Sequence, residues 1–370
     1  MRVLESTLAV SRRLFLGSLA AGACLAAERE RIFPSEIRRF KDLATEFDIF
    51  RLTDPRNRSW LPRSGRAISR RGVLLLYAND RSGSAQAYRL DLKSGESYGL
   101  TNVSGLVPQS LTLTPDERSF CYLDAQSFRL ANLSNLRERE IYKLESGYQG
   151  WGGLHVAEDG LYAALVEEKA GANRVRLINM RTGAAATVAE SSEALSDPMP
   201  RPRRAGLLYR RGSDQLWLVN YDGAQNRQLR LVPGGLGGAF WSADGRAVLY
   251  LNIPADPTKL HTIREHIPDT NEDRLVANTT QFVAFSGNGD SSVFVGASGA
   301  KASPYLLLLV RSVKRELTLC EHRASDPALT NPVFSPNSQR VFFQSDRDGK
   351  MALYAMVVDR LVAETETEDH

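Results

Sequence analysis

The chain has 370 residues, a length that at about 100–200 residues per domain allows two or three domains or one large architecture. Its 42% apolar and 24% charged residues are ordinary for a globular protein and exclude disorder for most of the chain. The formal net charge is +4, and the first 27 residues contribute three arginines against one glutamate, so the remainder carries +2. Such a small charge gives no electrostatic case for nucleic acid as a partner.

The first 27 residues are predicted to be a twin-arginine signal peptide. Arg12 and Arg13 precede an uncharged stretch, Leu14–Ala27, which is rich in Ala and Gly and shorter than the ~20 residues that span a bilayer. The protein is therefore expected to be exported by the twin-arginine route to the periplasm or the extracellular space. A lipid anchor at Cys24 is the alternative. No other segment approaches transmembrane length.

A repeated unit runs through the rest of the chain. Each copy contains an apolar strand, a turn such as Ala243-Asp244-Gly245, and an alternating strand that ends at Gly, as in Tyr88–Gly95. Successive turns lie 40 to 49 residues apart, the period of a four-stranded propeller blade. Seven units begin near Pro62, Leu106, Gly150, Leu195, Gly234, Thr279 and Leu329. The sequence therefore predicts an all-β fold, a seven-bladed β-propeller of four-stranded antiparallel blades.

The last unit ends one strand short, after Leu353–Val358. The segment Phe47–Thr53 has the pattern of the missing outer strand, so an N-terminal strand is expected to close the ring and remove an exposed sheet edge. The expected domain organisation is then a linker over residues 28–46, the propeller over 47–361 and a disordered acidic tail over 362–370.

Three stretches carry a resemblance to known families. Phe334–Arg347 resembles the repeats of TolB-like propellers. Tyr142–Gly152 and Leu216–Gly223, together with the last blade, resemble oligogalacturonate lyase, a seven-bladed propeller that cleaves short pectin fragments by β-elimination. The likeness spans most of residues 45–358. It implies a divalent metal such as manganese or calcium, held largely by imidazoles, and a histidine base at the inner ends of the blades.

The family's site positions hold other residues here. The base position is Gly238, two ligand positions are Leu329 and Asn331, and a further ligand corresponds to Gln281 or Phe282. An imidazole-rich metal site cannot be built from these side chains, so no metal and no cofactor are expected. The family's mechanism does not transfer to this chain, and no catalytic residue is assigned.

Five residues remain candidates for binding an anionic sugar. Arg63 and Arg66 are predicted to lie at the central channel, where guanidinium groups suit carboxylates, with a solvated basic face as the alternative. Arg210 has the same two interpretations. His155 lies in a predicted inner strand and either faces the channel or is a core histidine. Trp241 either stacks on a sugar or packs between blades.

Two functions follow as hypotheses. The first is an exported, oligogalacturonate-lyase-like propeller with a degenerate active site. It is expected to bind acidic, uronate-containing oligosaccharides without metal-dependent turnover, and cleavage by β-elimination stays open. The second is a non-catalytic TolB-like propeller that binds a cell-envelope protein. In both cases a monomer without a transmembrane span is expected. A channel mouth that forms an arginine-lined pocket favours the sugar, and a flat mouth favours the protein.

Overall fold

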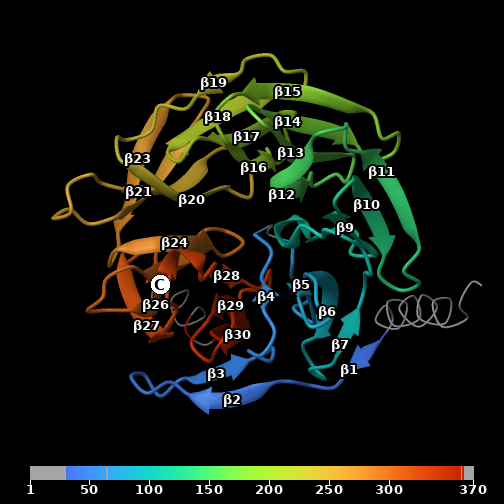
Figure 1. Cartoon of the computed structure of the whole chain (residues 1–370). Coiled ribbons are helices and arrows are strands. Elements are labelled where there is room, and N and C mark those ends of the chain that lie inside the picture. The colour runs from blue at the N-terminus through green and yellow to red at the C-terminus, as the bar shows by residue number, and fades with distance from the viewer. Residues whose placement is uncertain (1–30, 64–65, 360, 362–370) are drawn as a thin grey trace, which may run out of the picture.

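The structure, a computed structural model, describes residues 31–63, 66–359 and 361. The predicted signal peptide, the alternative anchor at Cys24 and the predicted acidic tail lie outside these residues. The described part of the chain folds into seven antiparallel sheets that stand around a central axis like the blades of a propeller (Figure 1). The prediction of an all-β seven-bladed propeller is confirmed.

The blades follow one another around the ring in chain order. From its inner to its outer strand, blade one contains β4 (Ser59–Trp60), β5 (Leu74–Asn79), β6 (Gln86–Asp91), β7 (Ser97–Gly99) and β1 (Ile32–Phe33). In the same direction, blade two contains β8 (Thr112–Leu113), β9 (Ser119–Leu123), β10 (Ser127–Asn132) and β11 (Glu138–Lys143). Blade three contains β12 (Gln149–Val156), β13 (Tyr162–Lys169), β14 (Ala172–Asn179) and β15 (Ala185–Ser191).

The second half of the ring is built in the same way. Blade four contains β16 (Leu195–Pro200), β17 (Gly206–Arg211), β18 (Gln215–Asn220) and β19 (Arg227–Gln228). Blade five contains β20 (Gly235–Trp241), β21 (Val248–Ile253), β22 (Thr262–Ile267) and β23 (Glu272–Asn278). Blade six contains β24 (Phe282–Gly287), β25 (Val293–Ser298), β26 (Tyr305–Val310) and β27 (Arg315–Glu321). Blade seven contains β28 (Val333–Phe334), β29 (Arg340–Ser345), β30 (Ala352–Val357), β3 (Asp48–Arg51) and β2 (Arg38–Lys41). Short 3-10 helices, η1 (Pro108–Ser110) and η2 (Pro327–Leu329), precede the inner strands of blades two and seven.

The hydrophobic core lies between neighbouring blades. In one cluster, Leu76 and Ala78 of β5 pack with Phe120 and Tyr122 of β9, and all four are fully buried. Alternating residues of the middle strands point to opposite faces of a sheet, so each blade contributes one apolar face to each neighbour. This arrangement explains why the middle strands are apolar on both faces while the outer strands carry most of the charge.

The ring closes through a sheet made from both ends of the chain. Strand β3 pairs with β30, with Phe50 opposite Ala355 and Arg51 opposite Tyr354, and the Leu52 amide donates to the Leu353 carbonyl at 2.7 Å. In Figure 1 the blue N-terminal strands lie directly beside the red C-terminal blade. The predicted closure by an N-terminal strand is therefore confirmed.

Part of the segment expected as a linker, residues 28–46, is strand. Strand β1 adds a fifth strand to blade one by pairing with β7, and β2 adds a fifth strand to blade seven by pairing with β3. Phe33 and Phe40 pack against the cores of these two blades, and this burial favours the short strands over a free linker. The outer edges of both blades at the closure are thereby covered.

Within the described residues, no helix is long and apolar enough to cross a membrane.

The inner strands of blades three to six are irregular where they pass the channel. The pairing register shifts between Trp151 and Leu154 in β12, between Ser196 and Met199 in β16, and at matching places in β20 and β24. Such β-bulges change the direction of the side chains that follow them and are common beside functional sites. Gly153, with φ of +98°, occupies a backbone region that glycine enters at little cost.

The closure is expected to carry a measurable part of the stability. Ile49 of β3 is fully buried in the core that blade seven shares with blade six. We predict that Ile49→Ala lowers the free energy of unfolding by about 2–5 kcal/mol, because it removes buried methyl groups and leaves a cavity. The matched control is Ile32→Ala in β1, whose side chain is 57% exposed, and it should change stability little. Urea unfolding of both variants tests this, and equal losses would contradict it.

Candidate functional site

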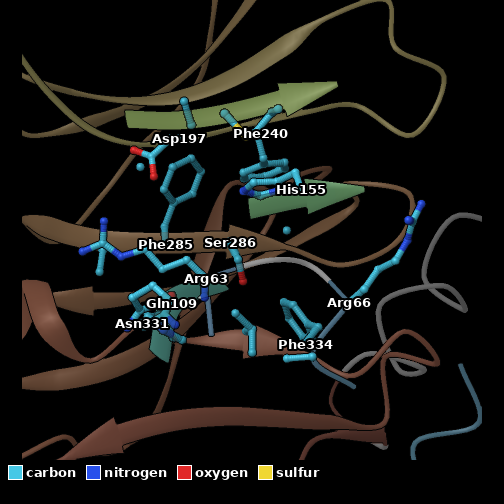
Figure 2. Close-up of a pocket in the computed structure, with 18 of the residues that line it drawn as sticks. Arg63, Arg66, Gln109, His155, Asp197, Phe240, Phe285, Ser286, Asn331 and Phe334 are labelled. Atoms are coloured by element: carbon cyan, nitrogen blue, oxygen red, sulfur yellow. Dashed lines mark hydrogen bonds between the residues drawn. The ribbon is translucent and has the colours of Figure 1, made fainter. Parts of the chain in front are cut away.

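A cavity of about 960 Å³ opens at the centre of the ring. All seven blades line it with residues from their inner strands or from the segments next to those strands. Figure 2 shows side chains from opposite sides of the ring converging on this space. The five residues that the sequence singled out all line it, namely Arg63, Arg66, His155, Arg210 and Trp241.

The cavity carries more positive than negative charge. Among the described residues, its charged lining consists of the arginines at 58, 63, 66 and 210 and of two carboxylates, Glu158 and Asp197. Arg58 stacks on Trp60, with its guanidinium carbon 5.1 Å from the ring centre. A concave site with surplus guanidinium charge attracts anions, and its low-dielectric walls strengthen that attraction.

Arg63 is the most available of these arginines. Its backbone N–H donates to Gln109 Oε1 at 3.1 Å, which fixes the main chain against blade two. Its side chain is exposed and forms no hydrogen bond or ion pair with the described residues. The guanidinium is therefore free to receive a ligand carboxylate in the two-pronged geometry that arginine favours.

Some of the hydrogen-bond donors of Arg66 are engaged by the protein itself. Its Nη1 donates to the carbonyl oxygens of Val156, at 2.9 Å, and Ala157, at 3.3 Å, and so ties blade one to the end of β12. Burial lowers the pKa of Arg66 from its usual value, but an arginine starts so high that it stays charged. Its Nε and Nη2 make no hydrogen bond with the described residues and remain for a ligand.

Arg210 serves mainly to position its neighbours. Its Nη1 donates to the carbonyls of Ser213 and Leu236, both at 3.1 Å, and its Nη2 donates to the Gly237 carbonyl. Its Nε lies 3.5 Å from Asp197 Oδ2. With most of its donors engaged, Arg210 lines the cavity but offers little to a ligand.

His155 faces the cavity from β12. Its neighbours in the strand, Leu154 and Val156, are buried against blade two, so alternation turns the imidazole toward blade four, where Asp197 lies. The ring is half-buried and forms no hydrogen bond with the described residues. Burial lowers the pKa of His155 to about 4, while the Asp197 carboxylate opposes this shift and the Arg66 charge adds to it. The imidazole is thus neutral near pH 7.

Trp241 closes one side of the cavity at the end of β20. Its indole N–H donates to the Met199 carbonyl at 3.2 Å, and the Arg201 guanidinium carbon lies 5.0 Å from its ring centre. One face of the indole is therefore occupied by the protein. Trp151, by contrast, is 52% exposed and lies outside the cavity lining.

The residues present do not fit the metal that the resemblance implies. Gly238, Leu329 and Asn331 all line the cavity, but only Asn331 has polar side-chain atoms, and its Nδ2 donates to the Leu61 carbonyl at 3.0 Å. Phe282 is fully buried, and Gln281 is not part of the lining. Among the described residues no three His, Cys, Asp or Glu side chains gather closely enough to hold a metal ion. A divalent cation needs several such donors.

Sequence reasoning missed several lining residues. Asp197 and the buried Ser286 hydroxyl, which has no hydrogen-bond partner in the described structure, both face this space. Phe240 and Phe285, with ring centres 5.3 Å apart, form an apolar wall (Figure 2). The sequence could have indicated these residues by their position in the inner strands of blades four to six. These strands correspond to the inner strand that holds His155 in blade three.

Comparison with known proteins agrees with the resemblance to oligogalacturonate lyase seen in the motifs. The chain is 24% identical over 375 residues to an oligogalacturonide lyase of Pectobacterium atrosepticum, and the match covers 87% of this chain and 96% of that protein. No family model matches the chain. A solved oligogalacturonate lyase in complex with manganese superposes with a TM-score of 0.82 at 21% identity, over 89% of this chain and 98% of that one. TolB from Acinetobacter baumannii gives a TM-score of 0.48 at 14% identity, over 85% of this chain and 71% of that one.

The lowered pKa of His155 leads to a prediction about how stability depends on pH. An exposed histidine has a pKa of about 6.5, so the unfolded chain binds this proton more tightly than the folded protein does. The contribution of His155 to stability is full above about pH 6.5 and is lost as the pH falls towards about 4. We predict that stability falls more steeply over this range in the wild type than in His155→Gln. Urea unfolding at several pH values measures this, and parallel curves would contradict it.

Proposed function

We propose that this protein binds acidic, uronate-containing oligosaccharides in the central cavity. The observation that carries the proposal is the pair of arginines, Arg63 and Arg66, which line the cavity and whose guanidinium donors are not all used by the described residues. The similarity to an oligogalacturonide lyase over most of both chains supports a uronate as the ligand. A hollow, basic channel mouth supports the sugar over a protein partner, which a flat mouth would suit better.

The chemistry of the cavity suits an anionic sugar in two ways. Guanidinium forks bind carboxylates through paired, charge-assisted hydrogen bonds. The apolar wall of Phe240 and Phe285, together with the Trp241 edge, offers surface to the faces of sugar rings. The volume of about 960 Å³ lies at the upper end of the range usual for small-molecule sites, about 300–1,000 Å³.

We also propose that the protein meets this ligand outside the cytoplasm, as the twin-arginine motif at Arg12 and Arg13 implies.

Binding is tested by calorimetry with trigalacturonate. We expect Arg63→Ala and Arg66→Ala each to weaken binding about tenfold or more, because a hydrogen bond to a charged group contributes about 1.5–3 kcal/mol. Arg71→Ala is the matched control, since Arg71 is exposed near the same blade but lies outside the cavity. An uncharged trisaccharide of galactose should not bind.

Equal binding of trigalacturonate to the wild type and to both cavity variants would refute the placement of the ligand. If trigalacturonate does not bind at all, the proposed function is wrong and a protein-binding propeller becomes the better hypothesis.

A second prediction concerns metal ions. We expect added manganese or calcium to leave the formation of unsaturated uronide unchanged relative to chelator-treated protein, because Leu329 and Asn331 cannot replace imidazole ligands. The product is followed by the ultraviolet absorbance of its C4–C5 double bond. Metal-stimulated product formation would contradict the prediction and would mean that other residues supply the ligands.

A further inference from the structure

We propose that His155 is the proton acceptor of a metal-independent β-elimination on the bound uronate, with the Arg66 guanidinium neutralising the carboxylate beside the reacting carbon. This inference rests on the proposed function, because it requires that a uronate occupies the cavity. It goes further by assigning an activity and a base where the position implied by the resemblance, Gly238, has no side chain.

Elimination from a uronate needs two groups close together. The proton on C5 becomes acidic enough to remove only when the charge of the adjacent carboxylate is neutralised, and a base must then accept that proton. A guanidinium can supply the neutralising charge that a metal supplies elsewhere, because it donates two parallel hydrogen bonds to a carboxylate. The remaining requirement is a group in the cavity that can act as the base.

The described lining of the cavity offers few proton acceptors. It contains no lysine or tyrosine, and its two carboxylates are Glu158 and Asp197. Asp197 lies 3.5 Å from the Arg210 guanidinium, which holds it as an ion pair. Glu158 is exposed on the turn between β12 and β13. His155 is the remaining acceptor, and its ring is free of hydrogen bonds to the described residues.

The geometry anchors the neutralising charge at the end of the strand that carries this imidazole. Arg66 donates to the carbonyls of Val156 and Ala157, the two residues that directly follow His155, so its guanidinium is anchored at the end of the same strand. In Figure 2 the Arg66 side chain lies near the end of the strand that carries His155. A uronate whose carboxylate contacts the free Nε and Nη2 of Arg66 would thus present its C5 proton near the imidazole.

The surroundings of His155 keep its imidazole in the neutral form that can accept a proton. Asp197 of β16 and Arg66 of blade one are the charged groups that act on His155, and burial leaves the ring neutral at pH 7 with a pKa of about 4. A neutral imidazole has a lone pair available to accept a proton. The carboxylate of an arriving uronate partly cancels the Arg66 charge, which makes the imidazole more basic when substrate is bound.

The reaction balances without any co-reactant other than water. The imidazole takes the C5 proton, and the electron pair of the C5–H bond forms the C4–C5 double bond as the C4–oxygen bond breaks. The leaving sugar oxygen takes a proton from water or from the imidazolium. Any remaining proton on the imidazolium passes to solvent, so the products are an unsaturated uronide and a shortened oligosaccharide, with no change of oxidation state overall.

The test measures product formation from trigalacturonate in the presence of a metal chelator. We expect the wild type to form unsaturated product, and His155→Gln to lower the rate about 100-fold or more, the range usual for loss of a general base. Binding of trigalacturonate to this variant should change less than about threefold, because the arginines that hold the carboxylate are retained. The control is His261→Gln, a half-buried histidine outside the cavity, which should keep the wild-type rate.

Two further readouts separate a base from a structural residue. The wild-type rate should rise with pH from about 4 and then level off, and this dependence should disappear in His155→Gln. Added imidazole should restore part of the activity of His155→Gly but not that of Arg66→Ala.

The outcomes distinguish this inference from the proposed function. If the wild type binds trigalacturonate but forms no product under chelator, or if His155→Gln keeps the wild-type rate, the assignment of His155 as base is wrong while the binding function stands. If the wild type does not bind trigalacturonate, both proposals fail.

Discussion

The pairing of β3 with β30 is the interaction on which the rest of the molecule depends. It joins residues about three hundred positions apart, Phe50 with Ala355 and Arg51 with Tyr354, and so turns an open row of sheets into a ring. The junction between blades seven and one also carries part of the site. The Leu61 amide donates to Gln344 Oε1 at 2.9 Å, and the Leu61 carbonyl accepts from Asn331. Arg63 follows two residues later, so its place in the cavity relies on the closure.

Arginines link the other blades around the same cavity. Arg66 connects blade one to the end of β12, and Arg210 connects blade four to the β20 carbonyls of Leu236 and Gly237. Backbone carbonyls beside the cavity thereby gain charged donors, and the Ala157 carbonyl, which also accepts from the Gly160 amide, gains a second one. The positive charge of the cavity thus has a structural origin as well as a proposed use. Only the donors that remain after this bridging are available to a ligand.

The sequence predicted the fold well because the blade is a repeated unit whose turns and strand periods recur seven times. It missed β1 and β2 because strands of two and four residues, the second of them mostly arginine and lysine, are too short to show alternation, and the burial of Phe33 and Phe40 depends on distant strands. Arg63 and Arg66 were predicted to lie at the channel from their blade positions, whereas Arg210, His155 and Trp241 were each left with two interpretations. That Arg210 is engaged while the Arg63 side chain makes no hydrogen bond with the described residues was not predictable, since the partners of Arg210 are mainly backbone carbonyls. The orientation of His155 depends likewise on the bulge before it.

The positions where the resemblance implies a base and metal ligands serve structural roles in this protein. A Cβ at Gly238 would lie 3.4 Å from Phe285 Cδ1, so Phe285 occupies the space beside this backbone. The Leu329 carbonyl accepts from Gln344 Nε2 at 2.7 Å, and Asn331 bridges to blade one. Returning imidazoles to these places would require repacking of the apolar wall and loss of contacts at the ring junction. A fixed guanidinium charge supplied from blade one needs none of these positions. Electrostatic recognition of a carboxylate is therefore compatible with a cavity that has no imidazole at these positions.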